Sequence, residues 1–448
     1  MAAAPETTPA AIRGPMLTFT GDPFRDGLAH TMRYEPDAIV AMADGKITHA
    51  GPADIIRPQL APDVKIESYG KDALISAGFI DTHVHYPQVP MIGAYGAQLL
   101  DWLNTYTFPT ELKYADKDFA RAAATVFLRE NLKNGITSSC VYCTVYPQSV
   151  EALFEEAEKL GLRLIAGKVM MDRNAPEKLM DTAKSSYDDS KALIATWHNR
   201  GRLLYAVTPR FAGTSTPAQL EAAGTLCREH PECYMQTHVS ENAGEVAWIR
   251  ELYPERNGYL DVYDHYALCR PRAVFGHGVH LTEDELGVMH RTGSAIAHCP
   301  TSNFFLGSGA FDLARAVAAE RPVRVGLGTD LGAGTSFSIL ATLNEAYKAA
   351  QFNGHALSAG HAHYLATRGG AQALYLADKI GSIAPGMEAD LVVLDMRSTP
   401  IIDYRMRFVE SFEEALFVQM TLGDDRAVQA TYVAGSLVFR RDKPAIFA

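Results

Sequence analysis

Apolar and polar positions follow three different patterns along the chain. From residue 16 to 75, short apolar stretches alternate with turns, and Asp44-Gly45 lies between two of them, as in a β-hairpin. From residue 76 to 384, near-continuous apolar stretches alternate with helical periodicity. From residue 385 onward, strand patterns return and end in ATYVAGSLVFRR. These patterns predict a large central region with a β segment on either side.

The central region predicts a parallel barrel. Its apolar strands are ALISAGFIDTHVH, GITSSCVYCT, LRLIAGKVMM, LLYAVTPR, CYMQTHVS, AVFGHGVHL, SAIAHCPTSN and VRVGLGTD, mostly separated by helical stretches. One such helix has Asp116 near its start and Gly135 at its end. Near-continuous apolar strands that alternate with helices are typical of a parallel sheet covered on both faces. We therefore expect an α/β fold, a (β/α)8 TIM-like barrel with a small β-sandwich domain built from both chain ends.

The expected domain boundaries follow from the same patterns. They are an Ala/Pro/Thr-rich tail at residues 1–15, a β-sandwich domain at residues 16–75 and 385–448, and a catalytic barrel at residues 76–384. At 448 residues the chain is long enough for this arrangement.

Composition narrows the class of protein. A hydrophobic content of 47% and a charged content of 21% are ordinary for a globular enzyme. The formal charge of −11 argues against nucleic acid as a partner, because a nucleic-acid-binding surface is basic. No apolar run reaches the length of a membrane span, and the first residues lack the apolar core of a secretory signal. We expect a cytoplasmic protein with a small-molecule substrate.

Six cysteines in a chain of this length do not predict a disulfide scaffold. Cys140 and Cys143 have the spacing of a zinc knuckle, but there is no second pair to complete four ligands. Because they lie in an apolar, β-branched stretch, we expect two buried cysteines in a strand.

Polar side chains gather where the predicted barrel strands end. His83 and His85 close the first strand, and alternation in a strand puts them on one face. His238 closes the fifth strand, His277 the sixth and Asp330 the eighth. Barrel enzymes have their active sites at this end of the strands. Each residue alone is more often structural than functional, but the coincidence favours a metal site.

The expected metal is one zinc ion per chain. Three imidazole nitrogens and one carboxylate suit zinc, with water as the remaining ligand, and the predicted ligands are His83, His85, His238 and Asp330. Zinc lowers the pKa of bound water towards neutrality. We expect three catalytic roles: Glu241 as a proton shuttle, Asp330 holding the attacking water, and His277 stabilising its charge.

These motifs resemble the amidohydrolase superfamily. DGKITHAGP near the start, and PGMEADLVVLD and YVAGSLVF near the end, are similar to its flanking β domain. The fourth strand ends in AVTPRF, which offers Arg210 and no lysine for carbamylation, and this favours a one-metal deaminase. The resemblance covers nearly all of the chain after the first dozen or so residues.

Within that superfamily the chain resembles the guanine deaminase family most. The similar segments are HYPQ, LLDWLNTYTFPTE, TPRF, THVSEN and FEEALFVQ. The resemblance implies hydrolysis of guanine to xanthine and ammonia, and a homodimer. It also implies that Arg210 hydrogen-bonds to guanine O6 and that Gln88 hydrogen-bonds to the N–H and ring-nitrogen edge of the base. Phe211 is expected to pack on the purine face. His85, His238, Glu241 and Asp330 complete the expected substrate contacts.

Alternatives remain open for several of these residues. Arg210 can be a structural ion-pair partner and Gln88 a loop cap, while Trp102 and the FPTE segment are interpreted as a packed loop over the barrel mouth and are not included among the site residues. Cytidine deaminases have a His-x-Glu motif that is followed later in the chain by Pro-Cys-x-x-Cys. This motif is excluded, because here His230-Pro231-Glu232 comes after Cys140 and Cys143, and Ser139 stands where the motif has proline. The rival functions are an aminohydrolase of 8-oxoguanine, a methylated purine or a triazine, and a non-catalytic barrel scaffold.

Overall fold

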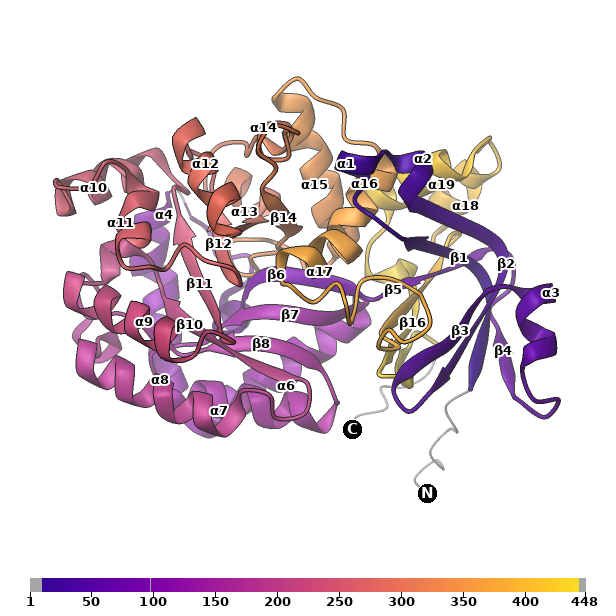
Figure 1. Ribbon diagram of the computed structural model, residues 1–448, viewed down its shortest axis with the longest axis horizontal. Helices are drawn as coiled ribbons and strands as arrows, with labels where there is room; N and C mark the ends of the chain where they lie inside the picture. Colours follow the sequence, from indigo (N-terminus) through magenta and orange to yellow (C-terminus); the bar gives the residue numbers. More distant parts are fainter. Residues whose placement is uncertain (1–9, 97, 443–448) are drawn as a thin grey trace.

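The computed structural model describes residues 10–96 and 98–442 and has a barrel beside a smaller β domain (Figure 1). The barrel strands are β6 (Phe79–His85), β7 (Ile136–Tyr142), β8 (Arg163–Gly167), β10 (Leu203–Pro209), β11 (Tyr234–Val239), β12 (Ala273–His277), β13 (Ala295–His298) and β14 (Arg324–Leu327). Each hydrogen-bonds in parallel with the next in this order. A two-residue strand, β9 (Val169–Met170), also pairs with β10. The predicted barrel fold is confirmed.

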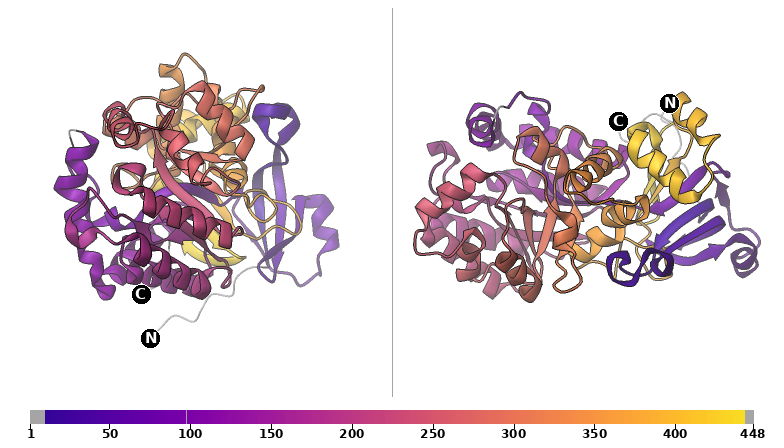
Figure 2. Two further views of the ribbon diagram at one scale, coloured as in Figure 1. Left: turned by 60° about the vertical axis from the view of Figure 1, so that its left-hand side comes forward. Right: turned by 90° about the horizontal axis from the view of Figure 1, so that it is seen from above.

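Helices surround the barrel and cover the outer faces of its strands (Figures 1 and 2). The longer ones are α6 (Lys117–Lys133), α7 (Pro147–Lys159), α8 (Ala183–Trp197), α9 (Pro217–Glu229), α10 (Ala243–Leu252), α11 (Tyr259–His265), α12 (Glu283–Thr292) and α15 (Ile339–Phe352). Helix α6 begins as its sequence predicts, with the Asp116 side chain accepting from the backbone N–H groups of Asp118 and Phe119. Shorter ones are α13 (Pro300–Phe305), α14 (Leu313–Ala316), α16 (Ala359–Tyr364) and α17 (Gly370–Ala373).

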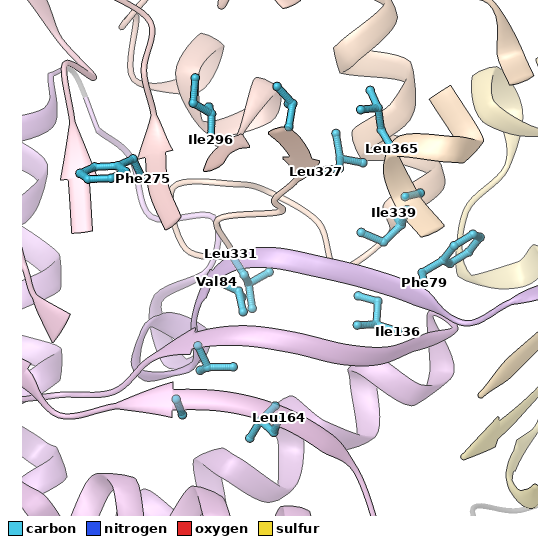
Figure 3. Close-up of a cluster of buried hydrophobic side chains, with 14 of the residues drawn as sticks. Phe79, Val84, Ile136, Leu164, Phe275, Ile296, Leu327, Leu331, Ile339 and Leu365 are labelled. Atoms are coloured by element: carbon cyan, nitrogen blue, oxygen red, sulfur yellow. The ribbon is translucent and has the colours of Figure 1, made fainter. Parts of the chain in front are cut away.

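Apolar side chains fill the layer between strands and helices. Phe79 of β6, Ile136 of β7 and Ile339 of α15 belong to one buried cluster there (Figure 3). The barrel interior holds a separate cluster that includes Cys140, and the Cys140 thiol donates to Oε1 of Gln236 over 3.1 Å. Cys140 and Cys143 are both free and buried, as predicted, but only Cys140 lies in β7, because Cys143 directly follows the end of that strand.

Strands from both ends of the chain form the second sheet. These strands are β1 (Ala11–Phe19), β2 (Met32–Ala43), β3 (Lys46–Pro52), β4 (Ile66–Ser68), β5 (Ala73–Ala77), β15 (Leu391–Asp395), β16 (Val428–Val433) and β17 (Ser436–Arg440). Strand β5 pairs with β1 on one side and with β15 on the other, which joins the two chain ends. Alternate residues of these strands face a shared core that contains Ile12, Val40, Ile75 and Val393. The β domain built from both chain ends is therefore confirmed.

Two details of the β domain follow from single residues. The predicted hairpin joins β2 and β3, where Asp44 has a φ of 50° and Gly45 a φ of 78°, the left-handed geometry that this turn requires. The predicted strand ALISAGFIDTHVH is divided at Gly78 between β5 and β6. A Cβ at Gly78 would lie 2.2 Å from Oγ1 of Thr137, so the close approach to β7 requires glycine.

The domain boundaries differ in detail from those expected. Strand β1 begins at Ala11, whereas a tail was expected through residue 15; residues 1–9 of that tail lie outside the described residues. The C-terminal segment also contributes two helices, α18 (Pro400–Met406) and α19 (Phe412–Leu422), and α19 packs on α15 and α16 of the barrel. Small helices α1 (Pro23–Asp26), α2 (Leu28–Thr31) and α3 (Ala53–Ile56) complete the β domain. Among the described residues, no helix is both long and apolar enough to cross a membrane.

Candidate metal centre and adjoining pocket

The histidines and the aspartate predicted from the sequence meet at one end of the barrel. His83 and His85 lie on β6, His238 on β11 and His277 at the end of β12, while Asp330 follows β14. Nε2 of His85 lies 3.1 Å from Nε2 of His238. Oδ1 of Asp330 lies 3.4 Å from Nε2 of His83 and 3.6 Å from Nε2 of His85. Four strand ends therefore bring five side chains that can ligate a metal ion within a few ångströms of one another.

The donor atoms of this cluster fit a divalent metal ion. Ligand atoms of His83, His85 and Asp330 lie within 4.8 Å of one another, as do those of His83, His238 and His277. Nε2 of His83 and Nε2 of His277 are buried without a hydrogen-bond partner among the described residues. Buried polar atoms are nearly always paired, so lone pairs that converge without partners indicate an ion site. Three imidazoles and a carboxylate are the ligand set that suits zinc.

Burial sets the protonation of these ligands. It lowers the pKa of His83, and it lowers the pKa values of His85 and His238 well below the ordinary range. Their imidazoles are therefore neutral, as metal binding requires. Burial opposes ionisation of Asp330, but the imidazoles of His83 and His277 beside its carboxyl group hold the pKa of Asp330 at about 2.

The backbone around the ligands is tightly constrained. His277 has a φ of 70° and Asp330 a φ of 47°, a left-handed conformation that non-glycine residues seldom adopt. The His83 ring lies against Gly276, where a Cβ would come within 2.5 Å of Cε1 of the ring. Asp81 accepts from the backbone N–H groups of His83 and Thr329, which ties the end of β6 to the end of β14. The surrounding fold holds the ligand positions.

Hydrogen bonds fix the tautomers of two imidazoles. Nδ1 of His238 donates to the carbonyl oxygen of Arg210 over 2.7 Å, which leaves the Nε2 lone pair directed at His85. Nδ1 of His277 donates to Oδ1 of Asn303 over 2.9 Å, so Nε2 of His277 faces the carboxyl groups of Glu241 and Asp330. These second-layer contacts orient the imidazoles as they do in metal sites generally.

Glu241 lies beside the cluster. Its Oε2 is 3.5 Å from Nε2 of His277, and burial raises the pKa of Glu241 to about 8. The Glu245 carboxylate accepts from the backbone N–H groups of Glu241 and Asn242 at 2.9 and 3.2 Å, and the Tyr259 hydroxyl donates to it over 2.7 Å. Glu245 thus anchors the backbone that carries Glu241. A carboxyl group held in this way can accept and return a proton.

A pocket opens on the cluster, with an empty volume of about 420 Å³ that includes space open to solvent. It is lined by His85, Gln88, Leu99, Trp102, Leu103, Arg210, Phe211, His238, Glu241, Glu245, His277, Leu306, Asp330 and Ala333. The apolar members come largely from the segment after β6, where α4 (Leu99–Trp102) leads through a π-helical turn to α5 (Phe108–Glu111). An apolar pocket with a few convergent polar groups is typical of a small-molecule site.

The polar groups of the pocket suit a flat heterocycle. Oε1 of Gln88 is buried without a partner among the described residues. The guanidinium of Arg210 is buried and forms an ion pair with Glu111 of α5. Arg210 also lines the pocket, so it is both an ion-pair partner and a pocket residue. Phe211 packs at 5.9 Å, centroid to centroid, from Trp248. The predicted substrate residues are thus brought together around one cavity.

A second group of possible ligands lies elsewhere in the barrel domain: His198, Glu232 and Cys233. Nδ1 of His198 accepts from the backbone N–H of Tyr205 over 3.1 Å, so Nε2 of the neutral ring carries the proton. His198 has no lone pair left for a metal ion, and this group is not a metal site in the present arrangement.

Comparison with known proteins agrees with the fold and the cluster. The model of the amidohydrolase family matches residues 74–438. The guanine deaminase of Escherichia coli strain K12 is 49% identical over 440 residues, which cover 98% of this chain and 99% of that protein. The chain belongs to the amidohydrolase family. Its resemblance to the guanine deaminases of that family is confirmed.

Solved structures extend this amidohydrolase's similarity to the whole fold. The structure of E. coli guanine deaminase matches with a TM-score of 0.93 and 49% identity, covering 96% of this chain and 99% of that one. A guanine deaminase from C. acetobutylicum with guanine bound in its active site matches with a TM-score of 0.84 and 27% identity, over 96% and 99% of the two chains. Barrel and β domain are therefore shared.

Sequence reasoning left out several pocket residues of this amidohydrolase. Trp102 and the FPTE segment, interpreted from the sequence as a packed loop over the barrel mouth, are not among the predicted site residues, yet Trp102 lines the pocket and Glu111 holds Arg210. Asn303 and Glu245 were also missed. A capping pattern did exist for Glu245, which stands three residues after Asn242 and completes a capping box at the start of α10.

Proposed function

We propose that this amidohydrolase is a zinc-dependent guanine deaminase that converts guanine and water to xanthine and ammonia. The observation that carries the proposal is a pocket in which Gln88 and Arg210 face the cluster of His83, His85, His238, His277 and Asp330. The guanine deaminase relatives, one of them with guanine in its active site, support the same substrate.

Zinc would be held by His83, His85, His238 and Asp330, where it supplies a Lewis acid that lowers the pKa of water. Arg210 donates hydrogen bonds to guanine O6, and the Gln88 amide meets the N–H and ring-nitrogen edge of the base. Phe211 packs against the purine face. The apolar residues Leu99, Trp102 and Leu103 exclude bulk water, which strengthens each polar contact in the pocket.

Proton movement in the proposed reaction belongs to Glu241. Water adds to C2, the carbon that carries the exocyclic amine, and Glu241 accepts the proton that the water loses. Glu241 passes that proton to ring nitrogen N3 and then carries the proton of the added hydroxyl to the exocyclic amine. The C2–N bond breaks as ammonia leaves and the C2 carbonyl of xanthine forms. Asp330 and His277 hold the attacking water and stabilise the charge that develops on it. Glu241 suits this role because its carboxyl group is buried beside His277.

The test is ultraviolet detection of xanthine formed from guanine by the purified protein, with metal content measured on the same sample. Adenine and 8-oxoguanine are run in parallel, since they separate guanine deamination from the other purine activities. Glu241→Gln prepared in the same way controls for contaminating activity. Metal-loaded protein that leaves guanine unchanged would overturn the proposal and favour a non-catalytic barrel.

We also propose a homodimer in the cytoplasm. Exposed apolar side chains at Ile401, Tyr404 and Phe408 lie on or just after α18 and suit a self-association surface. Sedimentation of the wild-type protein beside Tyr404→Glu tests the assembly, since a charge placed in such an interface weakens it.

A further inference from the structure

Glu111 and Arg210 form an ion pair buried in the wall of the pocket. Nη1 of Arg210 donates to Oε1 of Glu111 over 2.8 Å and to Oε2 over 2.9 Å. The side chain of Glu111 is fully buried and that of Arg210 is 3% exposed. Both oxygen contacts use Nη1, and Nε and Nη2 of Arg210 form no hydrogen bond with any residue that the structure describes, so their N–H groups can donate to a ligand.

The geometry of the pair suits two ionised groups, although burial raises the pKa of the Glu111 carboxyl group and the Arg210 guanidinium only partly offsets this. A guanidinium remains protonated in proteins, and an unpaired one in a buried wall is strongly destabilising. Both oxygens of Glu111 lie within hydrogen-bond distance of the same donor nitrogen, which suits a carboxylate and not a protonated carboxyl group. The pair therefore brings no net charge to the pocket, although it presents cationic N–H donors.

Glu111 makes no other side-chain hydrogen bond to a residue within the described ranges. It ends α5, in the segment between β6 and α6, while Arg210 directly follows β10. The Phe108 ring of α5 lies 5.7 Å from Cζ of Arg210. One short helix therefore supplies both the counter-charge and an apolar surface for the guanidinium, and the carboxylate has no visible task except Arg210.

We propose that Glu111 is a specificity-determining residue, which neutralises Arg210 so that the pocket selects uncharged purines over anionic ones. This inference rests on the proposed function. Arg210 alone would attract any anionic heterocycle that offers an oxygen at the position of guanine O6, because the pocket is buried and charges interact strongly there. With Glu111 in place, Arg210 recognises a carbonyl oxygen by hydrogen bonding, without a charge preference. Glu111 also fixes the guanidinium and is a positioning residue for it.

The experiment compares two purines that both carry O6 and cannot lose a 2-amino group. Hypoxanthine is neutral and urate is anionic at neutral pH. Their dissociation constants are measured by calorimetry on metal-loaded wild type, Glu111→Gln, Arg210→Gln and the double variant. Glutamine has the shape of glutamate, so the substitution leaves the size of the pocket unchanged. The difference in size between hypoxanthine and urate therefore affects wild type and variant equally and cancels when their affinity ratios are compared. Turnover of guanine is followed in parallel.

A matched control is Asp181→Asn, which removes the carboxylate of another buried ion pair, that with Lys168, outside the pocket lining. We expect Glu111→Gln to shift the ratio of urate to hypoxanthine affinity towards urate by on the order of tenfold or more, while Asp181→Asn leaves it unchanged. Glu111→Gln should also raise KM for guanine more than it lowers kcat. On the Arg210→Gln background, the buried Glu111 has no cation beside it and takes up a proton, so Glu111→Gln should no longer change the ratio.

An unchanged ratio in folded Glu111→Gln, in a protein whose wild type binds hypoxanthine, would overturn this inference and leave the proposed function standing. Should Glu111→Gln fail to fold, the comparison of Arg210→Gln with the double variant tests the inference. Equal ratios of urate to hypoxanthine affinity in these two proteins support it, and a ratio shifted towards urate in the double variant contradicts it. A wild type that binds neither purine but deaminates guanine would overturn this inference alone, and one that also leaves guanine unchanged would overturn both proposals.

Discussion

Nδ1 of His238 lies 2.7 Å from the carbonyl oxygen of Arg210. The backbone of Arg210 thus orients a predicted metal ligand, while its side chain faces the pocket. Because the first contact uses the main chain, replacing the Arg210 side chain separates substrate recognition from metal binding. Substitution of Arg210 should therefore affect substrate recognition without removing the metal ion.

His83→Ala and His238→Ala should each lose the metal ion and the activity, since only one cluster of three imidazoles with a carboxylate exists among the described residues. Wild type should carry about one zinc per chain. Elemental analysis beside an activity assay measures both. His355→Ala, at an exposed position, is the control. Full activity in a metal-free His83→Ala protein would refute the metal assignment.

Glu241→Gln should retain the metal ion, because Glu241 is not among the predicted ligands. Its turnover should fall by about 10²–10⁴-fold, the usual contribution of a general acid–base group. Steady-state kinetics and metal analysis on one preparation check this. Near-normal turnover in Glu241→Gln would show that another group, first of all His277, acts as the proton shuttle.

Arg210→Met should depress kcat/KM for guanine and raise KM while the metal ion stays bound. Adenine presents an amine donor where guanine has O6, and a site built to bind one group rejects the other by roughly 10⁴-fold or more. The variant should not deaminate adenine well, since adenine has no amine at C2. Comparing kcat/KM for both purines in wild type and variant is the measurement. Similar wild-type values would contradict the specificity.

Asn303→Leu should slow turnover by about 10–100-fold, the usual cost of losing a second-layer partner. Without Oδ1 of Asn303 as acceptor, Nδ1 of His277 loses the contact that orients the ring. The metal ion should remain, because the predicted ligand set does not include His277. Asn303→Asp keeps an acceptor of the same shape and is the matched control. Equal losses in both variants would show that this hydrogen bond is not the cause.

Glu388→Gln should lower the free energy of unfolding by about 2 kcal/mol, since hydrogen bonds to charged groups contribute at that level. Glu388 lies in the segment before β15 and accepts from Nε of Arg163 over 2.7 Å and from Nη2 of Arg202 over 2.6 Å, which ties the β domain to the barrel. Thermal unfolding measures the loss. Glu158→Gln, whose pair with Arg200 is exposed, should change little.

The same ion pairs predict a pH dependence. Burial opposes ionisation of Glu388, but Arg163 and Arg202 hold the pKa of Glu388 below its usual value. A carboxyl group with a depressed pKa in the folded state stabilises the fold above its unfolded pKa of about 4.3, and this contribution is lost as the pH falls further. The difference in stability between wild type and Glu388→Gln should therefore shrink below about pH 4. A constant difference down to acid pH would contradict this.

The sequence predicts those features that depend on local pattern. Alternation in a strand places His83 and His85 together, and the strand ends place His238, His277 and Asp330 at the same end of the barrel. The partnership of Glu111 with Arg210 has no such signal, because it joins residues far apart in the chain through the path of one short helix. The break at Gly78 was also missed, since it depends on the approach of Thr137 from the neighbouring strand.

The pairing of β5 with β15 has a consequence for synthesis on the ribosome. Residues 73–77 lead through Gly78 directly into the strand that carries His83 and His85, yet their partner is residues 391–395. During translation, β5 has an open edge until nearly the whole polypeptide has emerged. Contacts this distant in sequence slow folding and leave a strand edge open to aggregation. A nascent chain of this protein therefore needs shielding of that edge until its last segment arrives.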